Sequence, residues 1–251
     1  MIKRILSIGL PAFLIALLFS SLPAMAQTVS IDVGDAGDGT VTGRVVQLVA
    51  LLTILSLAPG ILMMMTSFTR IVVVLSFLRT AIGIQQTPPN MVLISLALFM
   101  TFFIMTPTFN AAYQNGIVPL INEDIDEMQA FDEMTKPFKS FMLEHTREDD
   151  LLLFSGMSNS GPYETAEDIP LQVVIPSFMI SELRRAFEIG FMLFLPFLII
   201  DMVTASILMA MGMMMLPPIT ISLPFKIIFF VVVDGWYLVA GSLIKSFGGG
   251  G

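Results

Sequence analysis

The residues best able to do chemistry in this 251-residue chain are a methionine cluster and a few isolated charges. Five methionines, at 209, 211, 213, 214 and 215, fall within seven residues and precede Pro217 and Pro218. Methionine is unbranched and polarizable, so several copies can close on one another or around a polypeptide of any sequence. Met209, Met211, Met213, Met214 and Met215 therefore predict an adaptable apolar gasket, although a methionine-rich helix is more often ordinary core filling.

The second group consists of charges that stand inside or beside apolar stretches, where an ionised side chain costs about 2.5 to 3.5 kcal/mol at a membrane centre. The group comprises Arg70, Glu182, Arg184, Arg185, Glu188, Asp201, Lys226 and Asp234. We expect these side chains to form assembly contacts with protein, because lone charges in lipid are too unfavourable.

Local pairing is the simplest interpretation for four of these charges. Glu182 with Arg185 and Arg184 with Glu188 have the i,i+3 and i,i+4 spacing of helix salt bridges. Lys226 stands alone beside Pro224, so it needs an acid. An interchain contact with Glu182 is the leading candidate, with Asp201 and Asp234 as rivals, and the partner of Arg70 is left open.

Catalytic chemistry is nearly excluded by composition. The chain has no Cys and a single His, His145, which is expected on the surface of an acidic region. Cysteine nucleophiles and Cys or His metal clusters are therefore ruled out. No Gly-x-Ser-x-Gly, His-Glu-x-x-His or phosphate-binding glycine loop occurs. We expect a protein that is not an enzyme, with no cofactor and no metal.

The elements that carry these residues are apolar. Hydrophobic residues make up 55% and charged residues 13% of the chain, against about 25% charged in soluble domains. Apolar stretches cover residues 45–78, 91–108, 189–215 and 219–247. The first would form a helix of roughly 50 Å against a hydrocarbon thickness of about 30 Å, so we expect a break at Pro59 and Gly60. The pattern predicts an all-α integral membrane protein built from broken hydrophobic helical hairpins.

One polar region interrupts the apolar stretches. Residues 122–168 hold 13 acids and three bases, a net charge of −10, so the other residues sum to +2 of the total of −8. Phe131, Met134, Phe138, Phe141 and Met142 recur at helical spacing and predict an amphipathic helix of about three turns. We expect a small helical extracytoplasmic, or periplasmic, insert standing in water. Its negative charge disfavours nucleic-acid binding.

The amino-terminal residues have the features of a secretory signal peptide. Lys3 and Arg4 precede an apolar run of 15 residues, and a small-x-small site ends at Ala26 before Gln27. An uncleaved first membrane helix is the alternative, but about 20 residues are needed to span a bilayer. The predicted divisions are a signal peptide (1–26), a flexible periplasmic lead-in (27–43), a first hairpin (44–110), the acidic insert (111–175), a second hairpin with the methionine loop (176–247) and a glycine tail (248–251).

Three segments carry a resemblance to a known family. The first contains Phe-Thr-Arg-Ile-Val-Val-Val-Leu-Ser-Phe-Leu-Arg at 68–79 and Gly-Ile-Gln-Gln-Thr-Pro-Pro-Asn at 83–90. The second contains Ser-Glu-Leu-x-x-Ala-Phe-x-Ile-Gly at 181–190, and the third runs from the methionine cluster to Asp-Gly-Trp at 234–236. In this order, around an acidic insert, they resemble the FliP/SctR family of type III secretion export-gate proteins. The signal peptide favours the flagellar branch over the injectisome relatives.

The resemblance implies a core subunit of the flagellar type III export gate. Family members form a pentameric ring with FliQ and FliR, and their hairpins are lifted from the membrane plane into a helical cone. FlhA, FlhB and the assembly factor FliO are implied as further partners, with unfolded flagellar proteins as export substrates and lipid around the complex. The implied location is the bacterial inner membrane and flagellar basal body, with a periplasmic portion, and the methionine cluster matches the family's gate.

The alternative function is a small-molecule or ion transporter. Ionisable residues within membrane segments, here Asp201, Lys226 and Asp234, often mark proton or ion pathways. Secondary transporters usually show internal repeats. The two apolar halves of this chain share no visible repeat, which favours the export gate.

Overall fold

The computed structural model describes residues 41–84, 86–158, 163, 165, 168–213 and 215–248. The signal peptide, its cleavage site at Ala26 and Gln27, and Met214 lie outside the described residues. All described elements are helical, which confirms the all-α prediction: α2 (Val41–Met64), α3 (Phe68–Ile82), α4 (Asn90–Ala112), the π-helix η1 (Tyr113–Ile117), α5 (Val118–Ile121), α6 (Glu127–His145), α7 (Glu148–Met157), α8 (Leu171–Ala210), α9 (Pro218–Val232) and α10 (Gly235–Lys245).

The chain divides into a unit that ends at Leu51 and a second unit that begins at Leu52 and contains the end of α2 and all later elements. The first apolar stretch does break, but not at Pro59 and Gly60, through which α2 continues. The break lies between Met64 and Phe68, where the Thr66 hydroxyl donates to the Met63 carbonyl (3.0 Å) and accepts from the Phe68 amide (3.4 Å). The Thr66 side chain forms hydrogen bonds at the ends of both helices and so sets the boundary between them. A proline does not set it, because apolar helices tolerate proline.

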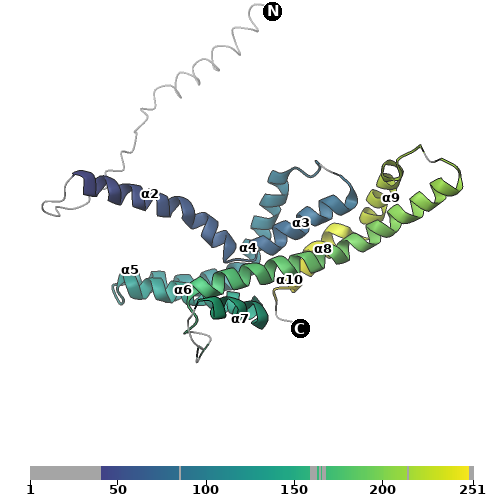
Figure 1. Ribbon diagram of the computed structural model, residues 1–251. Helices are drawn as coiled ribbons and strands as arrows, with labels where there is room; N and C mark the ends of the chain where they lie inside the picture. The colour runs from purple at the N-terminus through teal and green to yellow at the C-terminus, as the bar shows by residue number, and fades with distance from the viewer. Residues whose placement is uncertain are drawn as a thin grey trace, which may run out of the picture. The chain divides into compact units, whose positions relative to one another are not determined.

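Helices α3 and α4 form the first helical hairpin (Figure 1). Gly83 ends α3 in the left-handed conformation (φ 91°), which glycine adopts without strain. Ile71, Val74, Leu75 and Leu78 follow the i, i+3, i+4, i+7 pattern and are all buried on one face of α3. This face forms a hydrophobic cluster with side chains of α4, α8 and α10, and it fixes the position of the charged residues on α3.

The acidic insert contains α6 and α7. Asp126 caps α6 by accepting from the Gln129 amide (2.7 Å), and α6 extends over 19 residues, about five turns instead of the predicted three. Phe138 and Met142 of α6 share a buried cluster with Met105 of α4 and Phe178 of α8. The insert therefore has no separate core among the described residues, and its apolar face packs on the hairpin helices.

Helix α8 is the longest element, with 40 residues, and it includes Pro176 and Pro196 without ending at either. It begins 18 residues before the predicted apolar stretch, because charged residues between 182 and 188 lower the hydropathy without interrupting the helix. Helices α6 and α7 contact it, and α9 packs back against it after the methionine loop (Figure 1). Gly190 allows the Phe77 ring of α3 to approach, since a Cβ there would lie 2.6 Å from that ring.

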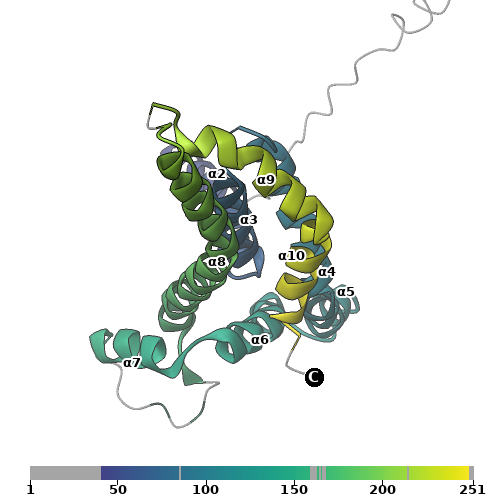
Figure 2. The same cartoon turned by 90° about the vertical axis from the view of Figure 1, so that its right-hand side faces the viewer.

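Helices α9 and α10 are separated by a bend of 62° (Figure 2). Asp234 adopts a left-handed conformation (φ 52°) at the bend. A Cβ on the next residue, Gly235, would lie 2.1 Å from the Phe230 ring, and that ring also makes an edge contact with Trp236 (5.5 Å). Only glycine fits against the ring, so the bend is closely packed. We call α9, the bend and α10 the arm.

Among the described residues, two continuous runs are long and apolar enough to cross a membrane: Asn90–Ile121, which joins α4, η1 and α5, and Leu171–Ala210. The arm brings the number to three if the bent pair counts as one span. Only 11% of the most apolar 18-residue window of α8 is buried within the chain. Exposed apolar area of this extent is typical of surfaces covered by lipid or by other subunits.

Candidate functional site: a buried ion-pair centre and an exposed methionine loop

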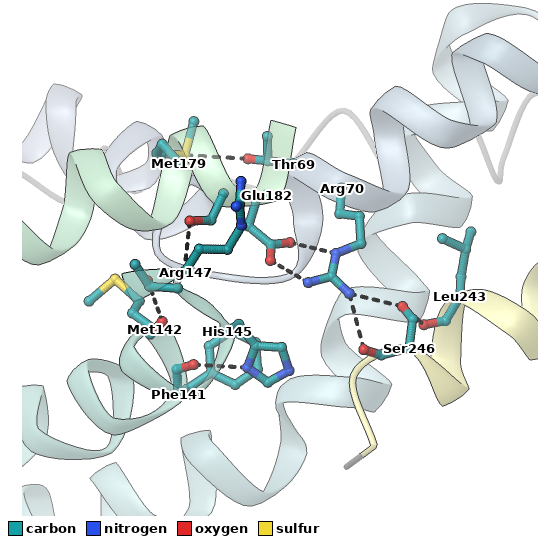
Figure 3. A network of polar contacts seen from close by, with 12 residues as sticks. Thr69, Arg70, Phe141, Met142, His145, Arg147, Met179, Glu182, Leu243 and Ser246 are labelled. Carbon is teal, nitrogen blue, oxygen red and sulfur yellow. Dashed lines mark hydrogen bonds and ion pairs between the residues drawn. The ribbon is translucent and has the colours of Figure 1, made fainter. Parts of the chain in front are cut away.

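Arg70 of α3 and Glu182 of α8 form a fully buried ion pair, with side chains 1% and 0% exposed (Figure 3). The Arg70 Nε donates to Glu182 Oε2 at 2.8 Å, and Nη2 donates to Oε1. The planar guanidinium fork matches a carboxylate with two parallel bonds, the strongest geometry for such a pair. Glu182 is thus the partner of Arg70 that the sequence left open.

The carboxyl end of α10 completes this centre. The Arg70 Nη1 donates to the Ser246 carbonyl (3.1 Å) and to the Ser246 hydroxyl (3.0 Å). The Phe247 ring lies 3.7 Å from the guanidinium carbon, which is a cation–π contact. Arg70 therefore joins α3, α8 and the end of α10, and most of its donors have partners that are far apart in the sequence.

His145 borders the same centre, and its predicted surface position is wrong. The imidazole is 5% exposed, and its Nδ1 lies 2.9 Å from the Phe141 carbonyl (Figure 3). The ring packs against Phe141 (4.6 Å between centroids) and Phe247 (5.3 Å). The acidic residues near His145 in the sequence suggested an exposed position. The face of α6 that carries His145 and Phe141 instead points inward.

A second ion pair joins α8 to α9. Lys226 donates to Asp201 Oδ2 at 2.6 Å and to the Ala81 carbonyl at 3.2 Å, and the Ser222 hydroxyl donates to Asp201 Oδ1 at 2.6 Å. The Lys226 side chain is 4% exposed and that of Asp201 27%. The acid and the base stand on different helices, so the pair fastens the start of the arm to α8.

The expected pairing of Glu182 with Lys226 is therefore not the one formed within the chain. Asp201, one of the rivals, pairs with Lys226. Glu182 and Asp201 are 19 residues apart on one continuous helix, which separates them by about 28 Å. The two acids consequently belong to different centres, and each has its own base.

The remaining charges lie on outer surfaces. Arg184 and Glu188 form the expected local pair at 3.2 Å, with both side chains 57% exposed. Arg185 is half-buried near Glu182, whose two oxygens are occupied by Arg70, and Asp234 is exposed at the bend. These four residues are accessible, in part or wholly, to another chain.

The methionine loop connects α8 to α9. Gly212 adopts a left-handed conformation (φ 73°), its amide donates to the Met209 carbonyl (3.0 Å), and the Met213 amide donates to the Leu208 carbonyl (3.0 Å). These two bonds form a Schellman motif, so Gly212 ends α8. Pro217 and Pro218 instead begin α9, where Pro218 lacks only a donor that the first turn does not use.

The described methionines of this loop point away from the core. Met209 is 58%, Met211 66%, Met213 40% and Met215 100% exposed. Met105 and Met142, in contrast, are fully buried in the core. The described loop methionines therefore do not fill the interior of this chain.

Sequence patterns missed several members of the two centres. Ser246 and Phe247 follow the last basic residue of α10 without a recognisable motif, and Ser222 has no spacing that links it to Asp201. The charges of Arg70 and Lys226 did give a signal, since a base within an apolar helix requires an acid. For Lys226, the identity of that acid depends on the return of α9 along α8.

These features define a helical membrane protein whose buried charges are paired between helices. A family model described as the FliP family matches residues 51–243. The chain is 61% identical over 231 residues to flagellar biosynthetic protein FliP of Caulobacter vibrioides, covering 91% of this chain and 86% of the relative.

Two further relatives have the same name. Flagellar biosynthetic protein FliP of Bacillus subtilis is 54% identical and covers 86% of this chain and 98% of its own length. That of Rhizobium meliloti is 50% identical, covering 94% and 97%. The chain belongs to the FliP family. Its members are flagellar biosynthetic proteins of the export apparatus, and the chain is accordingly not an enzyme.

Proposed function

We propose that this chain is a core subunit of the flagellar type III export gate, forming with FliQ and FliR the channel through which unfolded flagellar proteins pass. Several copies of the methionine loop would meet at the channel axis and act as its gasket. The observation that carries this proposal is the exposed loop at the end of a long helix whose apolar surface is mostly uncovered in the single chain.

The surface chemistry of α8 and α9 supports assembly into a ring. Phe191, Met202, Ile207, Phe225 and Val232 are all more than half exposed. Surfaces of this kind are covered in the functional state by lipid or by neighbouring subunits. A pentamer with FliQ and FliR, served by FlhA, FlhB and FliO, would cover them and leave the acidic insert in the periplasm.

The exposed charges are the candidates for contacts between copies. Arg70, Glu182, Asp201 and Lys226 are engaged within the chain, so their role in assembly is indirect: they fix the helices that present the interface. Arg184, Arg185, Glu188 and Asp234 lie where a neighbouring copy can reach them. The transporter alternative is not favoured, because membership of the FliP family points to flagellar export.

The gasket is tested by ion leak through the resting complex. We expect replacement of Met213, Met214 and Met215 by Ala to raise ion flux through the purified complex in planar bilayers, because the shorter side chains leave an open aperture. Replacement of the same residues by Leu keeps apolar volume and is the matched control, for which we expect flux close to that of the wild type. Unchanged flux in the Ala variant, with normal assembly by native mass spectrometry, would contradict a seal.

Assembly is tested separately by weighing the chain purified alone and together with its FliQ and FliR homologues. We expect a homo-oligomer alone and a larger complex with the partners. A monomer in both preparations would exclude the ring.

A further inference from the structure

We propose that Ser246 and Phe247 form a latch that couples the acidic insert to the arm. The two residues lie just after the end of α10 and outside residues 51–243, the part matched by the family model. Their contacts reach two other elements, α3 through Arg70 and α6 through Phe141, and Arg70 in turn holds Glu182 of α8.

The latch binds at the guanidinium group of Arg70, which is held by Glu182 and which we call the seat. Two bonds to Glu182 hold the guanidinium plane of Arg70, so its Nη1 group is already oriented when the latch arrives (Figure 3). Nη1 then donates to the carbonyl and hydroxyl of Ser246. The acceptor carbonyl stands at the carboxyl end of α10, where the helix dipole is negative and favours a cation. Loss of the latch would leave buried donors of Arg70 without partners.

Phe247 connects the seat to the insert. Its ring lies over Arg70, stacks with Phe141 (6.1 Å between centroids, 18° between planes) and also contacts His145. Phe141 and His145 both belong to α6, so one aromatic side chain joins the end of the arm to the principal helix of the insert. Phe247 is 6% exposed, which shows that the contact is closely packed.

The arm provides the connection from the latch to the methionine loop. Val239 and Leu243 seat α10 in the same core, and the packed bend at Gly235 joins α10 to α9. Helix α9 begins directly after the loop and is fastened to α8 through Lys226. A displacement of the insert would thus pass through Phe247 to α10, and through the bend to the loop. Only the passage of the displacement from the bend to the methionine loop rests on the proposed function of that loop as a gasket.

Hydrogen exchange of the full mature chain in detergent, followed by mass spectrometry, tests the latch. We expect a chain that stops after Lys245 to exchange its α10 amides about tenfold faster, because the seat is empty and local opening is easier. A chain that stops after Gly248 retains the latch and should match the wild type. Unchanged α10 exchange in the first variant would overturn the proposal.

Milder variants keep the test decisive if the shortened chain fails to accumulate. Phe247→Leu keeps the bonds of Ser246 but loses the aromatic contacts, and we expect exchange of α10 to rise about threefold to tenfold. Phe141→Leu removes the same stacking from the insert side and should accelerate exchange in α10, although Phe141 lies on another helix. In the double variant the two effects should not add, because both remove one contact.

Phe109→Leu is the matched control for this coupling. Phe109 of α4 makes an edge contact with Phe138 of α6 (5.7 Å), so it perturbs the insert without touching the latch. We expect it to leave α10 exchange unchanged. If Phe109→Leu accelerates α10 as much as Phe141→Leu, or if the Phe141 and Phe247 effects add, the latch does not couple the two regions. These exchange results are independent of ion flux and stand whether or not the loop is a gasket.

Discussion

Two carboxylates of α8, Glu182 and Glu188, stand six residues apart and both pair with an arginine, yet their surroundings are opposite. Glu182 is fully buried against Arg70 of another helix, whereas Glu188 is 57% exposed beside Arg184 of its own helix. The inner pair joins α3, α8 and the end of α10, while the outer pair joins one turn to the next. Identical chemistry therefore fixes the fold on one face of α8 and leaves the other face open to a partner.

The largest effect should come from removing one member of the inner pair. We expect Arg70→Ala to lower the free energy of unfolding by about 3 to 5 kcal/mol, because Glu182 would be a buried charge without its base. Thermal unfolding in detergent and the amount of chain in the membrane measure this loss.

A double replacement sharpens this first prediction. Arg70→Met combined with Glu182→Leu leaves no uncompensated charge and should be more stable than either single variant, since apolar side chains of similar size often replace a buried pair. A double variant no more stable than the singles would show that the contacts with Ser246 and Phe247 matter more than charge compensation.

An intermediate and asymmetric effect is expected at the pair of Asp201 with Lys226. The base is 4% exposed and the acid 27%. Lys226→Met leaves an acid that water and Ser222 still reach, so we expect a loss of about 1 to 3 kcal/mol. Asp201→Asn leaves a buried cation and should destabilise more. The order of the two unfolding temperatures checks this, and the reverse order would show that Asp201 is the less hydrated partner.

The smallest effect should come from the outer pair. Arg184→Ala should change the free energy of unfolding by less than about 0.5 kcal/mol, because exposed helix pairs contribute little. The same unfolding measurement applies. If the assembled complex is weakened while the isolated chain is not, the outer face of α8 is an interface, whereas a loss as large as that for Arg70→Ala would remove the contrast between the two faces.

Much of the architecture could be predicted from sequence, because helical periodicity records which faces are apolar. The predicted spacing of Phe138, Phe141 and Met142 gave the apolar face of the second half of α6, whereas Phe131, predicted on the same face, is 55% exposed. The predicted break at Pro59 was wrong, since a proline removes one donor while Thr66 satisfies two helix ends. Helix propensity and the hydrogen bonding of helix ends both determine where a helix stops, and the sequence pattern records only the propensity.

The candidate centres were less accessible to sequence reasoning. Hydropathy marks Arg70 and Lys226 as charges that need partners, but it does not say which helices meet. The acid for Lys226 depends on the return of α9 along α8, and the place of His145 depends on the rotation of α6. The role of Phe247 has no local signal at all, because a single aromatic residue near a chain end resembles many others.

The packed bend at Gly235 has a mechanical consequence. A hinge with empty space around it absorbs motion, but here the Phe230 ring occupies the space that a side chain would need, and Trp236 backs that ring. We therefore expect the bend to transmit a displacement between α10 and α9 and not to absorb it. If the latch couples the insert to the arm as proposed, a shift at the end of α10 would pass across this 62° bend into α9, which begins next to the methionine loop.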